Sequence, residues 1–145
     1  MVHHTTSPSL EAMLTSVVDG TRADGITGVD VLLRPALGAT VTDLLGAGAV
    51  VLGTPANMGY MSGALKHFFD QVYYPCLTAT VGTAYGLFVH GNLDATGAAR
   101  SVHGIATGLQ WRRAAEDVVV LGEPTKDGLA ACWELGATLA ATLSD

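Results

Sequence analysis

A cluster of hydroxyl side chains near the start of the chain could bind a phosphate group. The segment Thr5-Thr6-Ser7-Pro8-Ser9-Leu10 lies between a predicted first strand and a predicted first helix. Hydroxyls, free backbone amides and the positive end of a helix dipole all favour a phosphate dianion. The segment has no lysine, so it is not a P-loop. Ser7 and Ser9 could instead serve only to cap the helix, and the residue types leave both interpretations open.

A second candidate segment offers many backbone hydrogen-bonding groups and little side-chain bulk. It is Thr54-Pro55-Ala56-Asn57-Met58-Gly59-Tyr60, which follows the apolar run Val50–Gly53 and precedes a stretch with helical spacing. A strand, a polar loop and a helix in that order place the loop where open α/β sheets bind ligands. Such a loop suits a flat heteroaromatic ring with polar edges.

A third loop follows the next apolar run and contains a histidine. In Val89-His90-Gly91-Asn92-Leu93-Asp94, His90 comes at the carboxyl end of a predicted strand, where it could contact a ring or an oxidant. A lone histidine is also often a structural residue. Asp94 is better placed to cap the following helix.

Alternating strand-like and helix-like segments must position these three loops. Apolar runs predict five strands, of which the first is short: 2–5, 28–33, 49–53, 83–89 and 118–121. Apolar periodicity and capping residues predict five helices: 8–23, 41–45, 62–73, 96–109 and 125–143. We expect the third helix to stop before Pro75.

This alternation predicts an α/β fold with a parallel sheet covered by helices on both faces. The strand order 2-1-3-4-5 is one of two common outcomes. A receiver domain would need acidic residues after the first strand, where His3 and His4 stand instead. Half of a Rossmann fold would need G-x-G-x-x-G after that strand, and the sequence lacks it. The two histidines are adjacent in a strand and face opposite sides, which argues against a metal site.

Composition narrows the classes of function. The chain has 145 residues, 49% of them apolar, and we expect a single domain over residues 1–145. A net charge of −6 argues against nucleic-acid binding. No apolar run approaches the roughly 20 residues of a membrane span, and no signal peptide is visible. Cys76 and Cys132 are expected to be reduced thiols in a cytoplasmic protein.

The segment from Gly53 to Asp70 carries a family resemblance. It satisfies every fixed position of G-T-P-x-x-x-G-x-M-S-G-x-x-K-x-F-x-D. This motif resembles that of flavodoxin-like proteins, especially the quinone-reductase branch related to tryptophan-repressor-binding protein. The first loop also resembles the phosphate loop of that family, T/S-x-T/S/Y-G-x-T. Thr5 and Ser7 match it, whereas Pro8 replaces the usual glycine and Leu10 the final threonine.

The resemblance implies a flavodoxin-like three-layer sandwich, a five-stranded parallel sheet of order 2-1-3-4-5 that binds FMN. Met58 stands where relatives often have an aromatic residue over the flavin ring, and Gly59 could permit a peptide flip toward the flavin N5. The cofactor-binding residues expected from it are Thr5, Thr6, Ser7, Pro8, Ser9, Leu10, Thr54, Pro55, Ala56, Asn57, Met58, Gly59, Tyr60, His90, Gly91 and Asn92.

Three functions remain open. The first is an electron carrier that docks a redox partner protein, which the short length and the acidity favour. The second is an NAD(P)H-dependent FMN or quinone oxidoreductase, which the wording of the motif favours. The third is a flavin-free α/β binding module. We expect no separate catalytic side chain and no metal, and the protein could be a monomer or a dimer.

Overall fold

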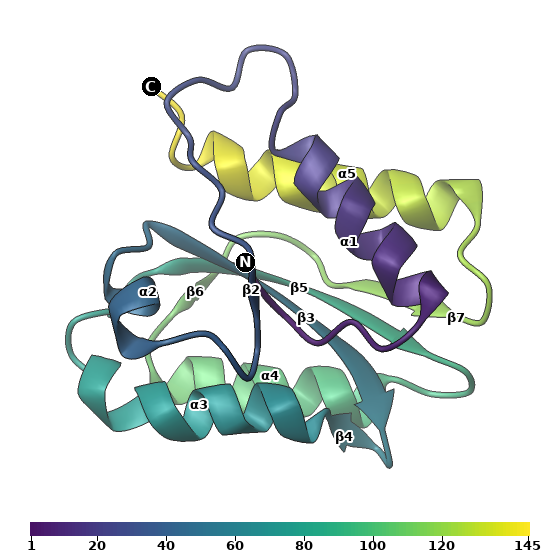
Figure 1. Cartoon of the computed structure of the whole chain (residues 1–145), viewed down its shortest axis with the longest axis horizontal. Coiled ribbons are helices and arrows are strands. Elements are labelled where there is room, and N and C mark those ends of the chain that lie inside the picture. Colours follow the sequence, from purple (N-terminus) through teal and green to yellow (C-terminus); the bar gives the residue numbers. More distant parts are fainter.

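A parallel β-sheet runs through the middle of the computed structural model, which describes residues 1–145 (Figure 1). Its strands are β1 (Val2–His3), β2 (Arg34–Pro35), β3 (Ala49–Asn57), β4 (Tyr60–Met61), β5 (Ala84–Gly91), β6 (Arg112–Arg113) and β7 (Val118–Leu121). The helices are α1 (Pro8–Gly20), α2 (Val41–Leu45), α3 (Gly63–Cys76), α4 (Thr96–Gly108) and α5 (Lys126–Ala141). No helix combines the length and the apolar character that a membrane crossing requires.

The strand order confirms the predicted fold class. The path runs β2-β1-β3-β5, and both β6 and β7 pair with β5 in parallel. β6 and β7 are thus two pieces of one interrupted fifth strand, which makes the order 2-1-3-4-5. β4 stands outside this order because it pairs antiparallel with the end of β3. The longest pairing joins β3 to β5, from Ala49 opposite Ala84 to Pro55 opposite His90.

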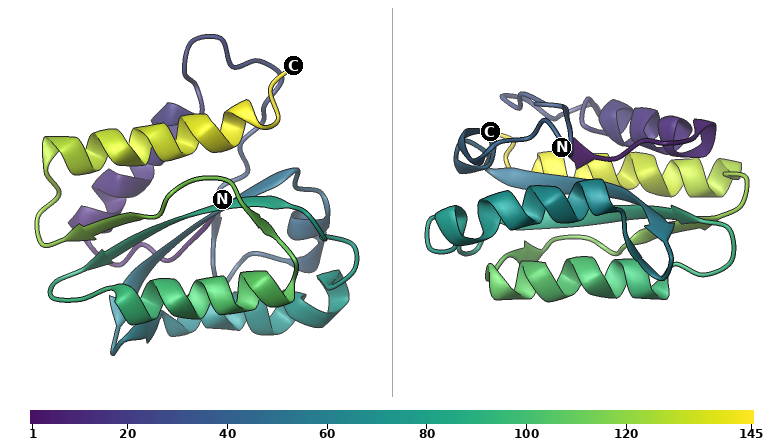
Figure 2. Two further views of the ribbon diagram at one scale, coloured as in Figure 1. Left: turned by 180° about the vertical axis from the view of Figure 1, so that it is seen from behind. Right: turned by 60° about the horizontal axis from the view of Figure 1, so that its bottom comes forward.

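Two layers of helices cover the sheet, as Figures 1 and 2 show. α1 and α5 lie on one face, and α2, α3 and α4 lie on the other. Successive residues of β3 point to opposite faces, so Val51 packs in the α1/α5 cluster while Val50 and Leu52 pack in the other. The continuous apolar run of β3 is therefore buried on both sides, as expected of a central parallel strand.

Two glycines allow α1 and α5 to pack closely. A Cβ atom on Gly20 would overlap the carbonyl of Trp133, and one on Gly136 would overlap the carbonyl of Val17. The two helix backbones therefore approach each other at both points. The spacing of residues in the sequence did not predict this contact between α1 and α5.

The predicted second strand is wrong in position. Residues 28–33 are not a strand, and β2 is only Arg34–Pro35. The register explains the difference, because Val2 pairs with Arg34 and the chain opposite residues 28–32 offers no neighbouring strand. Val31, Leu32 and Leu33 are accordingly 37%, 44% and 41% exposed.

Two further predictions about elements need correction. α3 continues through Pro75 to Cys76 instead of stopping before the proline. Pro75 lies in the last turn, where a proline removes only one helical hydrogen bond, and Val72 and Cys76 are fully buried. β6 was missed because Arg112 and Arg113 are exposed and give no apolar signal.

Candidate cofactor-binding site

The three candidate loops meet at one edge of the sheet. β1, β3 and β5 are parallel neighbours in that order, so their carboxyl ends lie side by side. The first loop leads from β1 into α1, the second follows Gly53 in β3, and the third leads from β5 into α4. In Figure 1 this edge is at the right, where α1 begins and β4 turns back. The predicted convergence of the three loops is present.

The first loop carries unused hydrogen-bond donors. The backbone amides of Thr5, Thr6, Ser7 and Ser9 donate to no group of the protein. The Ser7 hydroxyl accepts from the Leu10 amide at 3.2 Å and caps α1, as one of the two interpretations predicted. Capping therefore uses one hydroxyl and one amide, and leaves four amides free for an anion.

Not every predicted residue of this loop can serve a ligand. The Leu10 side chain is buried in the α1/α5 cluster, and its amide is already bonded to Ser7. Pro8 is exposed at the start of α1 and has no amide proton. The hydroxyls of Thr6 and Ser9 have no partner within the chain, so they are the available side-chain donors.

Two histidines stand behind the first loop. Nδ1 of His3 lies 2.8 Å from the Thr5 hydroxyl. Burial is the largest cause that lowers the pKa of His3, so its ring is neutral at pH 7. The His4 amide donates to the Gly53 carbonyl, whereas its buried Nδ1 has no partner. An anion here would be held by neutral donors and the α1 dipole.

The second loop is a β-hairpin, which corrects the prediction of an irregular loop. β3 continues through Asn57 and pairs antiparallel with β4, and Met58 and Gly59 form the turn. Both turn residues have positive φ, 48° and 73°, as in the type I′ turns that join hairpin strands. Asn57, Met58, Gly59 and Tyr60 are exposed, and the Met58 side chain is fully so.

The base of the hairpin is structural. The buried Thr54 hydroxyl donates to the Pro55 carbonyl at 2.8 Å and accepts from the Ser62 amide at 3.0 Å. Pro55 is also buried, and Ala56 is half-buried. Thr54 therefore offers no free group to a ligand.

Helix α4 supports the tip of the hairpin. The Met61 amide donates to the Ser101 hydroxyl at 3.1 Å. A Cβ atom at Gly97 would overlap the carbonyl oxygen of Gly59, so the turn rests directly on the first turn of α4. The Gly59 carbonyl thus lies against α4, while Met58 and Gly59 themselves are exposed.

The third loop begins later than predicted, because β5 continues through His90 and Gly91. Nε2 of His90 lies 2.8 Å from the Gly122 carbonyl, which ties this loop to the one after β7 and leaves Nδ1 as an acceptor. Asp94 accepts from both the amide and the hydroxyl of Thr96, and the amide bond is the largest cause that lowers the pKa of Asp94. Asp94 thus acts at the start of α4, as the sequence favoured.

Sequence reasoning missed two apolar side chains at this edge. Leu93 is 91% exposed in the third loop, and Leu121 is half exposed at the end of β7. A single leucine between Asn92 and Asp94 was the available signal for the first. With Met58 and Tyr60 they give the edge exposed apolar side chains next to its free amides.

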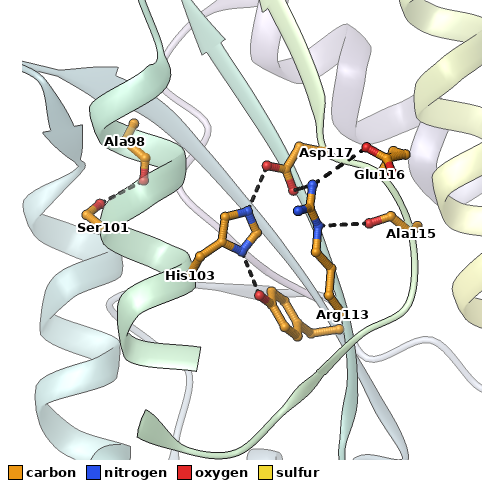
Figure 3. Close-up of polar contacts among 8 residues, drawn as sticks. Ala98, Ser101, His103, Arg113, Ala115, Glu116 and Asp117 are labelled. Carbon is orange, nitrogen blue, oxygen red and sulfur yellow. Dashed lines mark hydrogen bonds and ion pairs between the residues drawn. The ribbon is translucent and has the colours of Figure 1, made fainter. Parts of the chain in front are cut away.

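A second polar cluster lies away from this edge (Figure 3). The Tyr85 hydroxyl is 2.6 Å from Nδ1 of His103, and Nε2 of His103 is 2.7 Å from Asp117, which also pairs with Arg113 at 3.1 Å. These residues join β5, α4 and the gap between β6 and β7. Tyr85 is only 4% exposed, and through these contacts the cluster ties α4 to the interrupted fifth strand.

Comparisons with known proteins give consistent matches. No family model matches the chain. A curated flavodoxin from Aquifex aeolicus is 33% identical over 72 residues, which are 50% of this chain and 38% of that protein. The chain thus matches about two fifths of the length of that relative.

Solved structures match over nearly the whole chain. A flavodoxin from the domain Archaea has a TM-score of 0.83 at 19% identity, covering 98% of this chain and 95% of that one. The rubredoxin:oxygen oxidoreductase of Desulfovibrio gigas has a TM-score of 0.81 at 17% identity, and the match covers 98% of this chain and 35% of that one. A WrbA-like flavodoxin from Agrobacterium tumefaciens has a TM-score of 0.77 at 18% identity, and the match covers 97% of this chain and 93% of that one.

Proposed function

We propose that this chain, which has the flavodoxin-like fold, binds FMN at the carboxyl edge of its sheet and works as an electron carrier. The observation that carries the proposal is the set of four free amides in the first loop beside the exposed turn of the β3–β4 hairpin. FMN supplies the electron-transfer chemistry when bound, and the protein supplies binding, orientation and electrostatics.

The first loop fits a phosphate group. The amides of Thr5, Thr6, Ser7 and Ser9 would donate to its oxygens, with the hydroxyls of Thr6 and Ser9 as further donors. The buried, unpartnered Nδ1 of the half-buried His4 behind this loop is a further polar group that can accept or donate there. A neutral donor set at a helix N-terminus suffices for a dianion.

The hairpin and the third loop fit the ring. Met58 and Tyr60 supply exposed apolar surface for one face, and the exposed Asn92 supplies backbone groups for a polar edge. Gly91 before it is a support, since its carbonyl accepts from the Gly122 amide. Nδ1 of His90 is free to accept a hydrogen bond there. We propose Thr54 and Leu10 as supports of the site, since their polar groups are engaged.

The distribution of charge supports a carrier over a reductase. Arg112 and Arg113 lie on β6, which pairs with the amino end of β5, and Arg113 is paired with Asp117. Acidic residues occupy the carboxyl edge instead: Glu11, Asp94, Glu123 and Asp127. Such an edge suits a basic redox partner and repels the phosphates of NAD(P)H.

The oxidoreductase remains the second candidate. The motif from Gly53 to Asp70 and the likeness to a WrbA-like protein favour it. We further propose that residues 1–145 act as one cytoplasmic domain, as a monomer or dimer, with Cys76 and Cys132 reduced. Both cysteines are buried and unpaired, which supports that proposal.

One experiment separates the three functions. The protein is loaded with FMN, freed of excess flavin, and mixed without oxygen with NADPH or NADH while flavin absorbance is followed. A carrier retains FMN, responds to chemical reductants in separate one-electron steps, and responds slowly or not at all to nicotinamides. Bleaching at about 10 per second with quinone turnover favours the reductase, and failure to retain FMN favours the flavin-free module.

A further inference from the structure

The polar cluster of Figure 3 forms a continuous chain of contacts that begins at a buried phenol. Tyr85 on β5 is 4% exposed, and its hydroxyl lies 2.6 Å from Nδ1 of His103 on α4. Nε2 of His103 lies 2.7 Å from Oδ2 of Asp117, and the Arg113 guanidinium approaches Oδ1 at 3.1 Å. Both ring nitrogens of the histidine are therefore engaged, one with a phenol and the other with a carboxylate.

The partners fix the positions of the protons in this chain. Asp117, paired with Arg113, is a carboxylate that can only accept, so Nε2 of His103 carries a proton. Nδ1 of the neutral ring is then an acceptor, and the Tyr85 hydroxyl donates to it. Burial is the largest cause that raises the pKa of Tyr85, so the phenol keeps its proton near neutral pH. A base thus stands within hydrogen-bond distance of the phenolic proton.

This arrangement suits the removal of one electron from the Tyr85 ring. Loss of an electron makes a phenol strongly acidic, and a phenol cation in the protein interior is costly. With His103 in place, the phenolic O–H bond breaks as the electron leaves, and an N–H bond forms on Nδ1. The products are a neutral phenoxyl radical and an imidazolium that faces the Asp117 carboxylate, which stabilises its charge.

The neighbouring aromatic residues lack such a base. The hydroxyls of the other three tyrosines make no hydrogen bond within the chain. The ring of Trp111 lies 6.0 Å from that of Tyr85, and its indole N–H donates to the Thr80 hydroxyl at 2.9 Å. A hydroxyl is a poor proton acceptor compared with an imidazole. An electron vacancy that forms on Trp111 is therefore expected to pass to Tyr85.

We propose that Tyr85 is a redox-active residue that gives one electron to a high-potential outer-sphere oxidant and its proton to His103. Oxidants of this class, trivalent metal complexes among them, accept an electron without a binding pocket. The cluster reaches the surface at its polar end, where the side chains of His103 and Asp117 are 24% and 15% exposed. A one-electron reductant returns the electron, and the proton moves back from Nδ1 to the phenol. This activity does not depend on FMN, so it stands apart from the proposed function.

The test generates the oxidant with a flash of light. Photoexcited ruthenium(II) tris-bipyridine is quenched by pentaamminechlorocobalt(III), and the resulting ruthenium(III) complex oxidises the full chain without added flavin. The pH is about 8.5, where an unperturbed histidine is neutral. Transient absorbance should show a neutral tyrosyl radical that forms more slowly in D2O than in H2O. Electron paramagnetic resonance should show coupling to one exchangeable proton, the proton on Nδ1.

Four variants assign the radical and its proton acceptor. Tyr85→Phe should abolish the radical, whereas the matched control Tyr74→Phe, which removes an exposed phenol, should retain it. His103→Gln should slow its formation about 100-fold, the contribution of a positioned proton acceptor. Asp117→Asn should shorten the lifetime of the radical about tenfold, since a carboxylate in contact favours the imidazolium at least that much. Asp117→Asn keeps the shape of the side chain, so it tests the proton transfer if His103→Gln does not fold.

Several outcomes would overturn the proposal. One is the same radical in Tyr85→Phe, and another is a tryptophan radical in place of a tyrosyl radical. Equal rates in H2O and D2O would exclude a coupled proton transfer. Unchanged kinetics in the folded His103 or Asp117 variant would reduce the cluster to a structural contact.

Discussion

The hydroxyls of the first loop have separable roles. Ser7 caps α1, whereas the hydroxyls of Thr6 and Ser9 are free. The double variant Thr6→Val with Ser9→Ala should weaken FMN at least tenfold, since hydrogen bonds to charged groups contribute about 1.5–3 kcal/mol each. Riboflavin, which lacks the phosphate, should bind both proteins alike. Titrations with the two flavins measure this.

The control for this variant is Thr15→Val, an exposed position on the same helix. It should leave both affinities unchanged. If the double variant loses affinity for FMN and for riboflavin equally, the phosphate does not bind at the first loop.

A substitution at Gly59 tests whether the Met58–Gly59 turn affects the potential of bound FMN. Its φ of 73° is unfavourable for valine, while the space around its Cβ is open, so Gly59→Val acts through the backbone alone. We expect the first one-electron midpoint potential of bound FMN to fall by about 40 mV, equivalent to roughly 1 kcal/mol of lost backbone preference. Spectroelectrochemical titration gives the value.

Gly82→Val is the matched control, because Gly82 has a φ of 81° and open space but precedes β5 at the far edge. It should lower stability without moving the potential. Unchanged potentials in Gly59→Val with FMN still bound would exclude this turn from the redox chemistry.

At the scale of elements, the α1–α5 contact gives a clear prediction. Gly136→Ala forces a methyl into the Val17 carbonyl and should lower the free energy of unfolding by about 2–3 kcal/mol. Gly104→Ala in α4 meets open space and should raise it by roughly 0.5–1 kcal/mol through helix propensity. Urea unfolding measures both, and similar values for the two would contradict close packing at Gly136.

The elements also show what a sequence can predict. Capping residues and periodicity correctly located α1, α2 and α4, because Ser7, Thr40 and the apolar stripes act locally. The strand predicted at 28–33 failed because strand formation needs a neighbour, which no local pattern reveals. The Met58–Gly59 turn was missed because methionine gives no turn signal.

The arrangement of the three candidate loops was predictable to a similar extent. The order of elements brought the three loops to one edge, as topology requires. Which donors are free could not be predicted, since the engagement of Thr54 with Ser62 and of His90 with Gly122 depends on tertiary contacts.

For the whole molecule, the net charge of −6 should govern how partners dock. Electron transfer from the reduced holoprotein to a basic cytochrome should slow about tenfold between roughly 20 and 200 mM salt, as screening grows. Glu123→Gln with Asp127→Asn should reduce both the rate at low salt and the salt dependence. Stopped-flow mixing measures both.

Asp24→Asn with Glu134→Gln changes the net charge equally but away from the carboxyl edge. This double variant should change the electron-transfer rate at low salt and its salt dependence much less. If both double variants behave alike, overall charge and not the acidic edge steers the encounter.

The first glycine of the motif from Gly53 to Asp70 has a consequence for evolution. A Cβ atom at Gly53 would overlap the ring of Phe88, its neighbour on β5. The glycine is therefore explained by the phenylalanine beneath it and not by a ligand. Positions 53 and 88 should covary among relatives, with larger residues at 53 tolerated only where 88 is small, so a search that demands this glycine will overlook homologues that repacked the pair.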